Sequence, residues 1–147
     1  MTKRKRRSEP KRGSSSPSPP DLFVDRSLGR RKVPDRLREV HPHVIAHDDL
    51  FSQDTDDQVW LEEAGRQRWI VLTKDERIRW KPGEQQAIER SGARCFVLHP
   101  TKEMRAEEMA DVLVEALPRI LAAARYEKRR GFVKIVNRRG RVRHLFP

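Results

Sequence analysis

The sequence contains a single cysteine, Cys95, among its 147 residues. One cysteine excludes an intrachain disulfide framework and a zinc site built from cysteines. Cys95 lies in Arg94-Cys-Phe-Val-Leu98, where we expect a buried, inert thiol on a strand. A free thiol of this kind fits a reducing compartment.

Long hydrophobic runs are also absent. No apolar stretch approaches the roughly 20 residues that a membrane-spanning helix needs. The basic N-terminus is not followed by the apolar segment of a signal peptide. We therefore expect a soluble, cytoplasmic protein with no membrane partner. The Gly-x-Ser-x-Gly motif of serine hydrolases and the phosphate-binding loop Gly-x-x-x-x-Gly-Lys are also missing, so neither class of enzyme is supported.

Acidic residues are scarce at both ends of the chain. Residues 1–13 hold seven Lys or Arg and one Glu, and residues 119–147 hold ten and one, giving net charges of +6 and +9. The segment between them has a net charge of −4, and the whole chain carries +11. Basic ends attract nucleic-acid phosphates while an acidic middle retains negative charge for a metal. The alternative is that the basic ends bind an acidic partner or only aid solubility.

A low-complexity segment precedes the part of the chain that can fold. Residues 1–20 join a run of Lys and Arg to a Ser/Pro-rich stretch with nothing to bury, so we predict that they are disordered. The remaining length suits one domain. We expect an α/β domain over residues 21–126 and a basic β-hairpin over residues 127–147, packed on or beside it.

Hydrophobic patterning predicts strands that alternate with helices. The expected strands are 22–25, 43–47, 69–73 and 93–98, and the expected helices are 28–40, 55–65, 81–92 and 101–126. Gly65 is the predicted C-terminal cap of the second helix. Alternating apolar residues around Asn137-Arg-Arg-Gly140 predict the terminal hairpin. This order indicates helices packed on a mainly parallel sheet.

Carboxylates follow two of the expected strands. Asp25 ends the first strand and Asp75 ends the third, at the edge of a parallel sheet where ligands bind. Asp57, in the first turn of the helix before the third strand, can swing to the same edge. Three such acids can hold Mg²⁺ or Mn²⁺, and the ion can activate water for attack on a phosphodiester. Taken singly, the three residues are also explained as a turn residue, a partner of the helix dipole and a cap.

Three stretches in this order resemble the compact PIN-like domains related to VapC toxins: Phe23-Val-Asp25, Asp57-Gln-Val-Trp-Leu-Glu-Glu-Ala64 and Trp69-Ile-Val-Leu-Thr-Lys-Asp75. The resemblance covers residues 21–117, and a terminal hairpin is typical of the same group. It implies a three-layer α/β sandwich that acts as a metal-dependent ribonuclease, often the toxin of a toxin–antitoxin pair. RNA would be the substrate and an antitoxin protein the partner, and homodimers are common among such proteins.

The resemblance also implies roles for individual residues. Asp25, Asp57 and Asp75 would be the catalytic acids that bind the metal ion. Thr73 would be the small polar residue that orients a ligand or bound water near them.

One position departs from the family pattern. PIN-type sites usually carry a fourth acid soon after the third, and Arg77 stands there in this sequence. Glu76, Asp54 or Asp56 would have to substitute for it. Without a substitute, the alternative is a catalytically weak or inactive module that binds RNA through its basic ends, or a protein that binds only an acidic partner.

Further candidates concern contact with RNA. Four arginines lie in or beside the hairpin: Arg138, Arg139, Arg141 and Arg143. They contact phosphate, dock an acidic antitoxin segment or form a solvated face. Trp80 has basic neighbours and is either a base-stacking residue or part of the core rim. Trp60 and Trp69 lie in apolar runs and are predicted to be buried in the core.

Overall fold

The computed structural model describes residues 19–147. The segment predicted to be disordered, residues 1–20, falls outside this range except for Pro19 and Pro20. None of the helices in the described range is long and apolar enough to cross a membrane.

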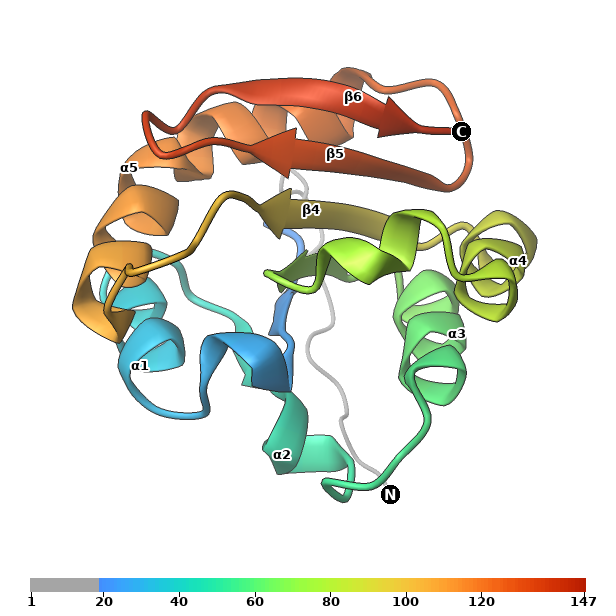
Figure 1. Cartoon of the computed structure of the whole chain (residues 1–147), viewed down its shortest axis with the longest axis horizontal. Helices are drawn as coiled ribbons and strands as arrows, with labels where there is room; N and C mark the ends of the chain where they lie inside the picture. The colour runs from blue at the N-terminus through green and yellow to red at the C-terminus, as the bar shows by residue number, and fades with distance from the viewer. Residues whose placement is uncertain (1–18) are drawn as a thin grey trace, which may run out of the picture.

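A six-stranded sheet forms the middle layer, with the strands in the order β2-β1-β3-β4-β5-β6 (Figure 1). The strands are β1 (Leu22–Val24), β2 (Val44–Ala46), β3 (Ile70–Thr73), β4 (Arg94–Leu98), β5 (Phe132–Val136) and β6 (Val142–Phe146). The first five run parallel, and β6 pairs antiparallel with β5 at the edge. The predicted α/β sandwich with a mainly parallel sheet and a C-terminal hairpin is confirmed. The hairpin continues the sheet, because β5 pairs directly with β4.

Helices cover both faces of this sheet. They are α1 (Lys32–Arg38), α2 (His47–Leu50), α3 (Asp57–Gln67), α4 (Pro82–Ser91) and α5 (Ala106–Tyr126), with short 3₁₀ turns η1 (Arg26–Leu28) and η2 (Glu76–Arg79). Helices α1 and α5 pack together on one face, and α3 and α4 pack together on the other (Figure 1).

The two strands at the centre of the site, β1 and β3, are almost entirely apolar because both of their faces are buried. In β1, Leu22 and Val24 join the core beneath α1 and α5, whereas Phe23 joins the core beneath α3 and α4. The Phe23 ring stacks on Trp69 with centroids 5.2 Å apart and lies 5.3 Å from Trp60. Both tryptophans are 2% exposed, so their predicted place in the core is confirmed. Continuous apolar runs are typical of parallel strands that helices cover on both sides.

Several helix boundaries differ from the prediction, and α5 begins at Ala106 where a start at residue 101 was expected. The helix expected over 28–40 begins only at Lys32, because the chain turns at Gly29 with φ +91° after η1. Gly65 does not cap its helix. Instead α3 continues to Gln67, and Arg68 adopts the left-handed conformation that ends it. Gly65 is needed for packing, since a Cβ at this position would lie 2.3 Å from Ser91 Oγ on α4.

The chain reverses its direction across the sheet between β1 and β3. From β1 it proceeds outward to β2, then crosses back over β1 to form β3 and continues to β4 on the other side. The register pairs Val24 with Leu72, so the carboxyl ends of β1 and β3 are adjacent. Such a switch point leaves a crevice at the carboxyl ends of the strands, where α/β proteins bind ligands.

Candidate active site

Asp25 follows β1 directly and lies at the switch point. It is only 7% exposed, and its Oδ2 accepts hydrogen bonds from Ser27 Oγ (2.7 Å) and Thr73 Oγ1 (2.8 Å). These donors offset the cost of burying a carboxylate. The other carboxylate oxygen, Oδ1, accepts no hydrogen bond from the described residues. The structure therefore places Thr73 against Asp25 and adds Ser27, which the sequence reasoning did not assign to the site.

The two hydroxyls also fix the loop that follows β3. Ser27 Oγ accepts the backbone N–H of Lys74 (3.1 Å), and Thr73 Oγ1 accepts that of Asp75 (3.0 Å). Each hydroxyl thus donates its single proton to Asp25 and accepts a backbone proton from this loop. The position of Asp75 is in this way linked to that of Asp25.

Asp75 is paired with Arg77, the residue that stands where the family pattern expects an acid. Its Oδ1 accepts Arg77 Nε (2.9 Å) and the Arg77 backbone N–H (3.1 Å), and its Oδ2 accepts Arg77 Nη2 (3.1 Å). Partial burial by itself would raise the pKa of Asp75, but the hydrogen bonds from Arg77 outweigh it and the pKa lies below its usual value. Asp75 is therefore ionised, and the positive charge of Arg77 balances its negative charge.

Asp57 lies at the first residue of α3, beside a buried acid that the sequence reasoning did not single out. Its Oδ1 accepts Trp60 Nε1 at 3.0 Å. The neighbouring acid is Glu84 on α4, which is 4% exposed and pairs with Lys81 Nζ at 3.1 Å. Burial raises the pKa of Glu84, as do the charge and hydrogen bond of Asp57, against the opposing effect of Lys81. In sequence Glu84 looks like an ordinary first-turn glutamate, so only its burial distinguishes it.

Electrostatic effects show that these acids share one region. The Arg77 guanidinium has a raised pKa because of its hydrogen bond and charge interaction with Asp75, with further contributions from Glu84 and Asp57. Burial raises the pKa of the Cys95 thiol beneath the site, and the charges of Asp25 and Glu84 raise it further. Asp57, Asp75 and Glu84 therefore lie near Arg77, and Asp25 and Glu84 lie near Cys95.

Among the substitutes expected for the fourth acid, Glu76 follows Asp75 at the start of η2 and Asp56 immediately precedes α3. Glu76 Oε1 is 3.6 Å from His99 Nε2, in the loop after β4. Asp56 is exposed and precedes α3 without a capping hydrogen bond from its side chain. Glu84 is a further, buried acid that the structure places beside Asp57.

The donor chemistry of this region suits a hard divalent cation, since it offers carboxylate and hydroxyl oxygens. As the side chains lie, no three Asp, Glu, His or Cys residues within the described range converge on one point that could hold an ion. The Arg77 guanidinium donates to both oxygens of Asp75.

The residues expected to contact RNA flank the same edge of the sheet. The β5–β6 turn follows the carboxyl end of β5, and Arg138 ties it to the loop after β4 through Lys102 O (2.6 Å) and Pro100 O (3.3 Å). Arg139, Arg141 and Arg143 are exposed. Trp80 follows η2 and is 51% exposed, so it lies at the surface beyond β3.

Comparison with known proteins identifies the class of this domain. Residues 20–100 match the family described as PIN like domain, a region that includes β1 to β4 and all four acids. The chain belongs to the PIN-like domain family, as its motifs predict. It is 31% identical over 109 residues to a Mycobacterium tuberculosis protein named "Putative ribonuclease VapC45", and the alignment covers 71% of this chain and 78% of that protein. No solved structure matches the chain.

Proposed function

We propose that this protein is a metal-dependent endoribonuclease and the toxin of a toxin–antitoxin pair. The observation that carries the proposal is the buried Asp25, held by two hydroxyls at the switch point, with Asp75, Asp57 and Glu84 gathered near Arg77. The relative named as a ribonuclease supports RNA as the substrate. An antitoxin protein would be the physiological partner.

The four acids would hold Mg²⁺ or Mn²⁺, which supplies Lewis acidity and an activated water when it is bound. The chain's own residues prepare that site. Ser27 and Thr73 fix Asp25 with Oδ1 available, and the Thr73 hydroxyl also positions the Asp75 backbone. Arg77 adds a positive charge to the site. When the Arg77 side chain breaks its ion pair with Asp75, it can bind an RNA phosphate.

RNA would approach along the carboxyl edge of the sheet. Exposed cations on the β5–β6 hairpin can contact phosphates, and Trp80 can stack on a base. The proposed cations are Arg138, Arg139, Arg141 and Arg143. Both features lie on the side of the sheet where β1 and β3 present their acids.

The first test is cleavage of mixed cellular RNA by the full chain with Mg²⁺, with Mn²⁺ and with EDTA. We expect metal-dependent cutting that Asp25→Asn and Asp75→Asn abolish. Asp111→Asn is the matched control, because Asp111 is an exposed acid on α5 that pairs with Arg36 and is not one of the four acids.

One observation favours a second function. Arg77 neutralises Asp75, and a site held in this state would bind RNA without cutting it. RNA binding with no cleavage under either metal would replace the nuclease proposal with this binding role.

A further inference from the structure

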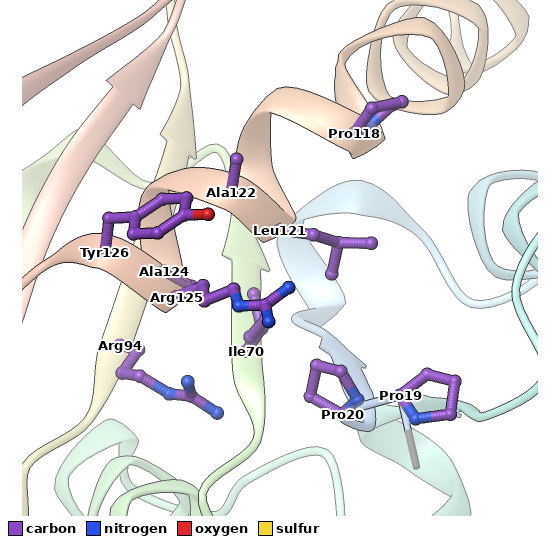
Figure 2. Close-up of a pocket in the computed structure, with 10 residues that line it drawn as sticks. All are labelled: Pro19, Pro20, Ile70, Arg94, Pro118, Leu121, Ala122, Ala124, Arg125 and Tyr126. Atoms are coloured by element: carbon purple, nitrogen blue, oxygen red, sulfur yellow. The ribbon is translucent and has the colours of Figure 1, made fainter. Parts of the chain in front are cut away.

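A cavity lies at the opposite end of the sheet from the four acids. It has a volume of about 540 Å³ and opens beside the first residues of β3 and β4, Ile70 and Arg94. Figure 2 shows the C-terminal turns of α5 on one side of it and Pro19 and Pro20 on the other. Its walls are mostly apolar, and its size is in the range of ligand-binding sites.

Two arginines give this apolar cavity a positive charge. Arg94 is the one residue in the described range with a buried side-chain nitrogen, Nε, that lacks a hydrogen-bond partner. Its Nη2 donates to the carbonyl of Arg68. Arg125 lies over the exposed ring of Tyr126, 5.9 Å from the centroid. Within the described residues neither arginine forms an ion pair with a carboxylate. Desolvating a guanidinium without an anion is costly, and a bound anion would offset that cost.

The positive charge extends beyond the cavity. Arg68 lines a neighbouring polar hollow of about 460 Å³ together with Arg66, Arg90 and Arg130. Arg66 and Arg90 pair with Glu63 and Glu62, whereas Arg130 donates to the backbone of Arg90. Within the described residues Arg68 and Arg130 pair with no carboxylate, so an anionic ligand in the cavity would meet these two cations along its flank.

We propose that this cavity binds an acidic peptide segment of a partner protein, with an apolar side chain inside and carboxylates on Arg94 and Arg125. Charge disfavours the chain's own N-terminal segment as the occupant, because residues 1–13 carry a net +6. RNA supplies negative charge but no aliphatic group for walls of Pro, Leu, Ile and Ala. The inference does not depend on nuclease activity, since the cavity shares no residue with the acidic site.

The test measures binding of a labelled peptide, Glu-Asp-Leu-Trp-Asp-Glu, to the full chain by fluorescence anisotropy. A second peptide with Ser in place of Leu and Trp keeps the charge and removes the apolar anchor. We expect the second peptide to bind roughly tenfold more weakly or worse. Arg125→Glu and Ala122→Trp should each weaken the first peptide by a similar factor, the former by charge reversal and the latter by filling the cavity.

Both substituted positions are exposed on α5, so the fold should persist, which circular dichroism checks. Lys102→Glu makes the same charge change at the other end of the sheet and should leave binding unchanged. Equal binding of the two peptides, or equal binding by wild type and both cavity variants, would overturn the proposal. So would an oligouridylate that binds in an Arg125-dependent manner when the peptide does not.

Discussion

Arg77 determines the ionisation of Asp75 more than any other neighbour does. Its side chain and backbone contribute three hydrogen bonds to this carboxylate, which is otherwise partly buried. The folded-state pKa of Asp75 is thereby depressed below its ordinary value of 3.8. The stabilisation from this pair is present above that value and is lost as the pH falls through the folded-state pKa.

We predict that Arg77→Gln raises the pKa of Asp75. Burial raises this pKa, and the variant removes the arginine charge and side-chain hydrogen bonds that lower it. Carboxyl ¹³C NMR titration of the variant and the wild type measures the difference. Arg36→Gln is the matched control, since Arg36 pairs with Asp111 on α5. An unchanged Asp75 pKa in Arg77→Gln would show that the pair is not maintained in solution.

At the scale of elements, α3 and α4 approach each other closely at Gly65. We predict that Gly65→Ala lowers the free energy of unfolding by about 1–3 kcal/mol, because the added Cβ collides with the Ser91 side chain and backbone. Urea denaturation measures this loss. Gly83→Ala on α4 is the control. Its Cβ would meet only the end of the exposed Gln58 side chain, which can move, so its cost should be small.

A largely buried ion pair connects the residue after α5 to β5. Glu127 Oε1 lies 2.7 Å from Lys134 Nζ, and each side chain is 10% exposed. The hydrogen bond from Lys134, aided by the Arg129 backbone, lowers the pKa of Glu127 to about 2. This contribution to stability is complete above the ordinary pKa of 4.5 and is lost as the pH falls from there towards 2.

We predict that Glu127→Gln lowers the free energy of unfolding at pH 7 by on the order of 2 kcal/mol, because Lys134 loses its charged partner. The variant should also lose less stability than the wild type between pH 4.5 and pH 2. Urea denaturation across this pH range tests both statements. Glu115→Gln, at an exposed position on the same helix, should behave like the wild type. Parallel pH profiles for Glu127→Gln and wild type would contradict the prediction.

For the whole molecule, charge is divided between the two ends of the sheet. The carboxyl ends carry the four acids with hairpin arginines beside them, whereas the amino ends carry the arginine-flanked cavity. RNA and an acidic peptide would therefore occupy opposite ends. The predicted domain limits, cytoplasmic location and homodimer remain predictions.

We predict that RNA binding weakens as salt rises, because phosphate contacts release counterions. Arg139→Gln should reduce the slope of log affinity against log salt by about 0.7, the value for one single-strand phosphate contact. Fluorescence anisotropy with an uncleavable RNA analogue at several salt concentrations measures the slope. Arg66→Gln makes the same charge change near the C-terminal end of α3, where Arg66 pairs with Glu63, and serves as the control. A slope that Arg139→Gln leaves unchanged would remove this arginine from the RNA contact surface.

The sequence alone determined the order of elements, the buried strands and the family. These features depend on consecutive residues. A continuous apolar run indicates a strand that is buried on both faces, and an acid that follows the run can be read directly from the sequence. The tertiary structure decided which side chains meet. Thr73 contacts Asp25 only because β1 and β3 pair in one register. Glu84 joins Asp57 only because α4 packs on α3. Such contacts join residues far apart in the chain, so they depend on crossovers and packing that no local pattern records.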